Sequence, residues 1–147
     1  MIMKRVVLIV WTLLLCVGNL FATKHWQTHF SYNSVQVIAM DKDEVYALAN
    51  GKLFSINQQT EQLTLFTNFS GLHGTEIAYI AYDESREQLL ILYSDGKVDI
   101  QRNKNMHYVS DLYSKQMTYS KRCNNITIQG DMAYLSMDFG ILTFDLV

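Results

Sequence analysis

Two histidines near the N-terminus are the first side chains to test as metal ligands. His25 and His29 are four residues apart, a spacing that aligns two imidazoles on a helix. In an extended segment the same spacing separates them by roughly 13 Å, at ~3.3 Å per residue. Trp26 and Phe30 beside them favour the extended interpretation, so we expect no metal site here.

The other two histidines are isolated from further ligands. His73 lies in the glycine-rich stretch Ser70-Gly-Leu-His-Gly74, with Glu76 three residues further on. A solvated loop residue explains His73 more simply than a functional site does. His107 falls on an expected outer strand, where we predict an exposed side chain.

Cys123 follows two cations, Lys121 and Arg122, which would lower a thiol pKa and favour the reactive thiolate. A nucleophile also needs a positioned base, and no histidine lies within 15 residues of Cys123 on either side. We therefore expect a buried cysteine rather than a catalytic one.

Carboxylates alternate in Asp41-Lys42-Asp43-Glu44, a pattern that could supply oxygen ligands to calcium. The run lacks the glycine and the terminal glutamate of the helical calcium loop. A short charged turn between two strands explains it equally well.

The chain has one stretch in which basic and aromatic residues alternate. It contains Lys115, Lys121 and Arg122 together with Tyr113 and Tyr119. Contact with an acidic glycan or a protein partner is one interpretation, and a solvated loop is the simpler one. We assign no catalytic, cofactor-binding or metal-binding residue from the sequence and expect no cofactor.

The first 22 residues have the layout of a secretory signal peptide. Lys4 and Arg5 precede an almost wholly apolar run over residues 6–17, and a polar break ends in Ala22, where we expect cleavage. The run of 12 residues is shorter than the roughly 20 that a membrane-spanning helix needs. A retained anchor, or a lipoprotein with lipid on Cys16, is a minor alternative.

Composition limits the function of the remaining 125 residues. They carry ten cations against fourteen acids, a net charge of −4, which argues against a nucleic-acid partner. The whole chain contains no proline and is 49% hydrophobic, which favours strands over disorder. Removal of Cys16 would leave Cys123 without a disulfide partner.

A repeat of about 45 residues organises the chain. Its central glycines, Gly51, Gly96 and Gly140, are separated by 45 and 44 residues. Each unit predicts an apolar strand, a polar turn, a second strand, a tight turn such as Asn50-Gly51 or Asp95-Gly96, and a third strand. Fourth strands are predicted at 63–67 and 107–112, and the first strand of each unit is expected to be covered on both faces.

Four antiparallel strands in every ~40–50 residues are typical of a β-propeller blade. We predict an all-β fold: an incomplete β-propeller of about two and a half to three four-stranded blades over residues 23–147, after the signal peptide at 1–22. The blades are predicted at about 35–68, 78–112 and 124–147. Propellers close with 4 to 8 blades, so we expect the front part of a longer protein. A small self-contained sheet protein, or closure of the ring by oligomerisation, is the alternative.

The mature region resembles the N-terminal β-propeller of the PorZ family, a component of the type IX secretion system. The resemblance rests on the segments at 26–33, 50–54, 70–77, 80–83, 93–100 and 133–141. The segment from Gly71-Leu72 to Ile80-Ala-Tyr-Asp83 also resembles the repeat of the periplasmic propellers of hybrid two-component sensors.

The PorZ resemblance implies a non-catalytic binding module in the attachment complex at the outer membrane. Its implied partners are a sortase-like protease of that complex, possible anionic lipopolysaccharide, and the remaining blades of a longer chain. The implied location is the cell surface, or the periplasm if the chain is natural as it stands. A ligand-sensing propeller of a hybrid sensor is the alternative function, and a propeller enzyme is a weaker one.

Overall fold

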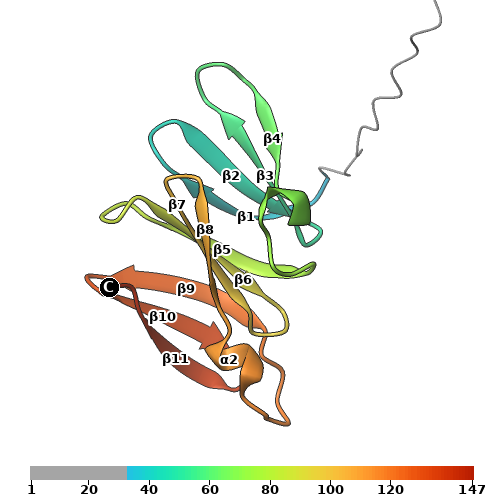
Figure 1. The fold of residues 1–147 in the computed structure, drawn as a ribbon, viewed down its shortest axis with the longest axis vertical. Coiled ribbons are helices and arrows are strands. Elements are labelled where there is room, and N and C mark those ends of the chain that lie inside the picture. Colours follow the sequence, from blue (N-terminus) through green and yellow to red (C-terminus); the bar gives the residue numbers. More distant parts are fainter. Residues whose placement is uncertain (1–32) are drawn as a thin grey trace, which may run out of the picture.

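The computed structural model describes residues 33–147, which form three antiparallel sheets stacked as propeller blades (Figure 1). Our predictions for the signal peptide, Cys16, His25 and His29 concern residues outside this range. Among residues 33–147, no helix has the length and apolar character needed to cross a bilayer.

Blades 1 and 2 are four-stranded meanders, with strand orders β1-β2-β3-β4 and β5-β6-β7-β8. In blade 1, the strands are β1 (Val35–Met40), β2 (Glu44–Ala49), β3 (Lys52–Asn57) and β4 (Leu63–Leu65). In blade 2, they are β5 (Ile77–Asp83), β6 (Gln88–Tyr93), β7 (Val98–Arg102) and β8 (Asn105–Val109). Blade 3 contains β9 (Cys123–Gln129), β10 (Met132–Met137) and β11 (Gly140–Asp145). The prediction of propeller blades is confirmed.

The first strands of the blades are neighbours, since β5 contacts both β1 and β9. This arrangement directs equivalent turns to the same edge of the stack. The turns β1–β2, β3–β4, β5–β6, β7–β8 and β9–β10 form one edge, which we call the turn edge. The turns β2–β3, β6–β7 and β10–β11, with the two connections between blades, form the opposite connection edge.

Packing between blades explains the continuous apolar run of β6. All six residues of β6 are buried. Leu89 and Ile91 belong to the apolar cluster shared with blade 1, whereas Leu90 and Leu92 belong to the cluster shared with blade 3. A continuous apolar run is therefore what a strand with two covered faces requires.

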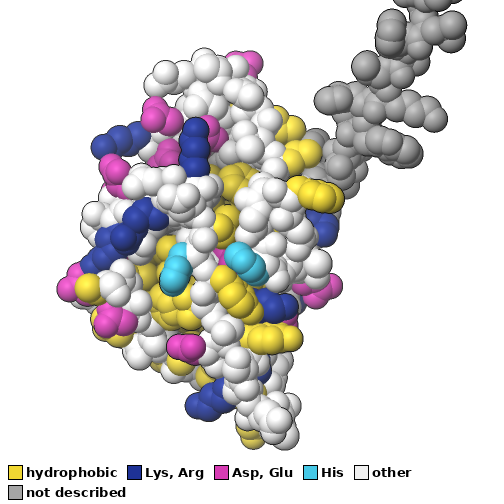
Figure 2. Space-filling model, in the orientation of Figure 1, with side chains coloured by type: hydrophobic (Ala, Val, Ile, Leu, Met, Phe, Trp, Pro, Cys, Tyr) yellow, Lys and Arg dark blue, Asp and Glu magenta, His cyan; other side chains and the backbone are white. Residues whose placement is uncertain are grey.

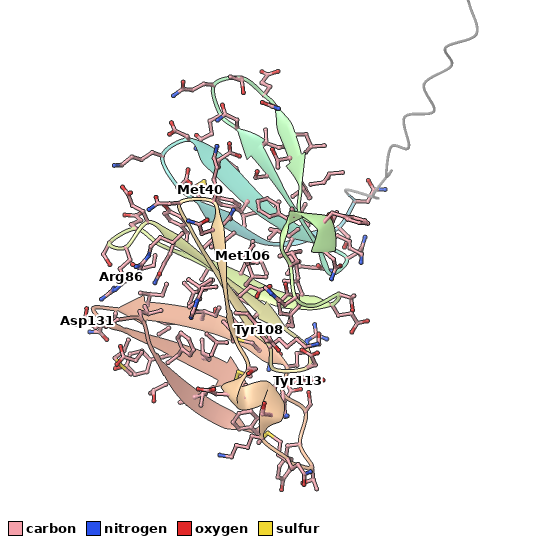
Figure 3. All side chains as sticks on the ribbon, viewed as in Figure 1. Met40, Arg86, Met106, Tyr108, Tyr113 and Asp131 are labelled. Atoms are coloured by element: carbon pink, nitrogen blue, oxygen red, sulfur yellow. The ribbon has the colours of Figure 1, made fainter. Side chains whose placement is uncertain are left out.

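The first strand of blade 1 differs from our prediction. Ile38 and Met40 of β1 are 60% and 58% exposed, and Met40 is labelled in Figure 3. In contrast, Ile80 of β5 is buried because blade 1 packs against that side of blade 2. Coverage of both faces thus holds for the middle blade only, within the described residues.

The turns also refine the sequence interpretation. Asn50 and Gly51 both have positive φ, as a two-residue hairpin of this kind requires. In blade 2, the Tyr93 N–H donates to the Lys97 carbonyl, which makes a three-residue loop instead of the predicted two-residue turn. Gly96 adopts the left-handed backbone conformation in this loop, with a φ of 91°.

The predicted strand at 107–112 was wrong at its C-terminal end. Strand β8 ends at Val109, and residues Asp111–Ser114 form the short helix α2. Leu112 packs into the cluster between blades 2 and 3, so the chain turns inward here to reach the first strand of the next blade. The predicted strand at 63–67 is present as Leu63–Leu65.

Candidate functional site

The connection from blade 1 to blade 2 is held close to the sheet by two glycines. Gly71 ends the 3-10 turn Asn68–Ser70 with a left-handed φ of 101°. A Cβ on Gly74 would lie 2.3 Å from the ring of Tyr93, a separation that no side chain tolerates. Glycine at position 74 therefore lets the loop cross directly over a buried tyrosine.

His73 is held in this loop by a buried carboxylate. Its Nδ1 lies 2.8 Å from Asp99 Oδ1, and its backbone N–H donates to Asp99 Oδ2 at 2.9 Å. The Tyr93 hydroxyl donates to the same Oδ2 at 2.6 Å, and Asp99 has no exposed surface. Burial, followed by the bond to Asp99, raises the pKa of Tyr93. Three donors thus satisfy one inward-facing carboxylate.

The partner of His73 differs from the one that its sequence neighbourhood suggests. Glu76 is close in sequence, but Asp99, 26 residues away, receives both bonds. The imidazole also stacks on Tyr108, with ring centroids 4.6 Å apart. His73 remains 43% exposed, so it is a partly solvated loop residue with a fixed orientation.

Two residues of the basic and aromatic stretch, Tyr113 and Lys121, come together on the connection edge. The Lys121 ammonium donates to the Tyr113 carbonyl at 2.7 Å. Lys97 Nζ lies 4.5 Å from the centre of the Tyr113 ring, a favourable cation–π distance. Lys97 was absent from the predicted set because it belongs to the β6–β7 turn. Tyr119 is 70% exposed.

A polar cleft of about 800 Å³ opens between blades 1 and 2 on the turn edge. Five carboxylates line it, from Asp41, Asp43, Glu44, Glu84 and Glu87, together with the amines of Lys42 and Lys104. Its aromatic residues, Tyr46 and Tyr82, stack across the two blades with centroids 6.2 Å apart. Sequence analysis did not find this cleft, since its lining comes from separate turns in both blades.

The suspected calcium ligands at 41–44 form the turn between β1 and β2. Asp41 Oδ1 accepts the backbone N–H groups of Asp43 and Glu44, and its Oδ2 accepts the Tyr46 hydroxyl at 3.1 Å. These bonds are those of a charged turn, the alternative to a calcium loop. Within residues 33–147, histidine, cysteine and carboxylate side chains nowhere form a group of three that could hold a metal ion.

Cys123 is buried at the first position of β9, as expected. Burial raises the pKa of its thiol to about 11, in spite of the adjacent cations. A thiol of this kind is a poor nucleophile at neutral pH. His107 lies exposed on β8, which also agrees with the prediction.

Side-chain charge is unequal between the two edges. With the charged residues at the adjoining strand ends included, the turn edge of residues 33–147 carries nine carboxylates against four cations, a net of −5. The connection edge carries four carboxylates against five cations, a net of +1. Figure 2 shows charged side chains gathered along the left margin, the side where Figure 3 labels Arg86 and Asp131; Tyr113 lies toward the other side.

A family model decides the relationship of this chain to known proteins. The model described as "TSS9, PorZ, N-terminal beta-propeller domain" matches residues 45–147. The chain belongs to this family. No curated protein sequence matches the chain.

Two solved structures are similar to the blades. The first is described as "PorZ, an essential bacterial surface component of the type-IX secretion system" of Porphyromonas gingivalis; it is 29% identical, with a TM-score of 0.75. The match covers 82% of this chain and 16% of the P. gingivalis chain, so this chain spans about a sixth of that protein.

The second structure is the extracellular domain of the putative one-component system BT4673 from B. thetaiotaomicron. It is 16% identical, with a TM-score of 0.60, and the match covers 78% of this chain and 15% of that one. At this identity the likeness concerns the fold alone. The PorZ family relationship therefore provides the functional context, and the second propeller supports only the architecture.

Proposed function

We propose that this chain is a non-catalytic, exported binding module that acts in type IX secretion at the bacterial surface. The match of the PorZ propeller family to residues 45–147 is the observation that carries the proposal. The P. gingivalis relative is described as an essential surface component of that system. The module would present its loops to the sortase-like protease of the attachment complex and to anionic lipopolysaccharide.

The connection edge is the surface best suited to an anionic polysaccharide. Lys97 and Lys121 lie on the Tyr113 ring, which is 46% exposed. Cations beside an aromatic face combine attraction for acidic groups with a flat apolar surface for a sugar ring. The turn edge, at a net charge of −5, would repel the same ligand.

Binding of purified anionic lipopolysaccharide to the full chain tests this assignment. The double variant Lys97→Gln with Lys121→Gln should bind roughly tenfold more weakly or worse, because two charge-assisted contacts are lost. Lys42→Gln with Lys104→Gln removes the same charge from the turn edge and should bind at least as well as the wild type. Equal losses in both double variants, or no binding by the wild type, would reject the connection edge as the glycan site.

The secretion role is tested separately in the bacterium that encodes the chain. Deletion of the gene should leave secreted cargo with its C-terminal signal uncleaved, because the PorZ resemblance implies that the sortase-like protease of the attachment complex removes that signal. Immunoblotting of cargo in cell and surface fractions measures the outcome. Normal cargo processing in the deletion strain would contradict a role in type IX secretion.

A further inference from the structure

The cleft on the turn edge has features that the proposed glycan contact does not use. Two of its lining residues have a buried acceptor atom, Glu44 Oε2 and Gln101 Oε1, each with less than 1 Å² exposed and no hydrogen-bond partner. Buried acceptors without donors destabilise a fold. Both residues line the gap between blades 1 and 2, Glu44 at the start of β2 and Gln101 near the end of β7.

Two donors of the cleft are already engaged, and a third extends over its mouth. Asn57 Nδ2 donates to the other oxygen of Glu44, Oε1, at 3.1 Å. The Tyr46 hydroxyl donates to Asp41. Lys42 reaches across the mouth to within 3.9 Å of Glu87 and is 91% exposed. The cleft therefore has an excess of acceptors and of negative charge, with five carboxylates against two amines.

We propose that this cleft binds an arginine-bearing peptide segment of a partner protein. A guanidinium carries five N–H donors and no acceptor, which matches the excess of acceptors. It also stacks on aromatic rings, and Tyr82 supplies a partly exposed ring in the lining.

The size of the cleft favours a peptide over a single small cation. About 800 Å³ lies in the upper part of the range for ligand pockets, roughly 300–1,000 Å³, and exceeds what one side chain fills. The charge favours a basic segment over a neutral sugar, because only a cation gains net electrostatic attraction from an excess of carboxylates. The cleft lies on the edge opposite the proposed glycan contact, so the peptide site and the glycan site can be tested independently.

Titration calorimetry of the full chain with capped glycine–arginine peptides tests the proposal. Three peptides of equal length are compared: one with arginine, one with its neutral isostere citrulline, and one with glutamate. The arginine peptide should bind, and the citrulline peptide should bind at least tenfold more weakly. Comparable binding of the citrulline peptide, or tighter binding of a neutral oligosaccharide that the Tyr82→Leu variant abolishes, would overturn the cationic assignment.

Matched variants locate the binding. Glu44→Gln keeps the shape and the acceptor for Asn57 but removes the charge, so affinity should fall about tenfold. Glu84→Gln, on an exposed turn, serves as a second variant if Glu44→Gln fails to fold. Glu76→Gln makes the same change of charge on the connection edge and should stay within about twofold of the wild type. Equal losses in all three variants, or no binding of the arginine peptide to the wild type, would refute the site.

Discussion

The two edges of the blade stack differ in what they contribute. On the connection edge, a loop crosses the Tyr93 ring at Gly74 and is bonded to the buried Asp99. On the turn edge, short charged turns surround an open cleft, and their carboxylates bond mainly to their own turns. The same meander topology thus places stabilising long-range contacts on one edge and accessible negative charge on the other.

The turn edge contains one clear exception, which joins blade 2 to blade 3. Arg86 Nη1 donates to Asp83 at 3.2 Å and to the Gly130 carbonyl at 3.0 Å, while Nη2 donates to Asp131. Burial alone would raise the pKa of Asp83, but hydrogen bonds from Ser85 and Arg86 outweigh it and lower that pKa. A similar cation is lacking in the gap between blades 1 and 2, where Lys42 stays exposed, and the cleft opens there.

The largest expected effect is the removal of the Asp99 carboxylate. Asp99→Ala leaves the buried Tyr93 hydroxyl and two donors of the partly exposed His73 without their acceptor. We expect a loss of about 3 kcal/mol in the free energy of unfolding, measured by urea denaturation. Asp145→Ala, which removes an exposed carboxylate from the turn edge, should change it by less than about 0.5 kcal/mol. Equal losses in the free energy of unfolding for Asp99→Ala and Asp145→Ala would contradict the distinction between the edges.

A methyl group at position 74 should have the next largest effect. Gly74→Ala forces the new Cβ to within 2.3 Å of the Tyr93 ring unless the loop or the ring moves. Overpacking of this kind costs about 1–3 kcal/mol. Thermal unfolding of Gly74→Ala, with Tyr93→Ala and the double variant, completes a cycle. Gly74→Ala should destabilise the Tyr93→Ala variant much less than it destabilises the wild type, because the ring is then absent. An equal destabilisation in both backgrounds would show that the strain does not come from the Tyr93 ring.

The sequence predicted the strands and turns of the blades, but it did not predict the long-range contact of Asp99 on the connection edge. The 45-residue repeat and the Asn50-Gly51 turn were sufficient to predict blades, because hairpins and alternation are local properties. Asp99 was missed because an aspartate on a strand is normally assigned to the solvent side. Its neighbours Val98 and Ile100 belong to the cluster facing blade 3, so alternation alone directs Asp99 toward blade 1, but the bond to His73 is a tertiary contact.

The cleft illustrates a different limit of sequence reasoning. Asp41 to Glu44 were recognised as carboxylates of a turn, and that interpretation agrees with their hydrogen bonds. The other lining residues, such as Tyr82 and Gln101, come from blade 2 and only approach the turn once the blades stack. Packing between blades, which no local pattern encodes, brings them together.

Alkaline pH gives a medium-sized test of the two edges through their buried tyrosines. Burial is the first cause that raises the pKa of both Tyr46 and Tyr93, followed by a neighbouring aspartate in each case. Because the pKa of each tyrosine is higher in the folded than in the unfolded protein, the stability is unaffected below the unfolded pKa of about 10 and falls as the pH rises above it. At pH 11 each tyrosine should lower the free energy of unfolding by about 1.4 kcal/mol. Urea denaturation from pH 8 to 11 should show a shallower decline for Tyr46→Phe and for Tyr93→Phe than for the wild type, and unchanged slopes would contradict this.

The smallest expected effect concerns the charge of the turn edge itself. Glu84→Gln removes an exposed carboxylate that lines the cleft. We expect a change in the free energy of unfolding within about 0.5 kcal/mol, because exposed charges contribute little to stability. A destabilisation above 1 kcal/mol in urea denaturation would show that this turn supports the fold. A near-zero change, with weaker binding of the arginine peptide, would instead separate recognition on the turn edge from structural support on the connection edge.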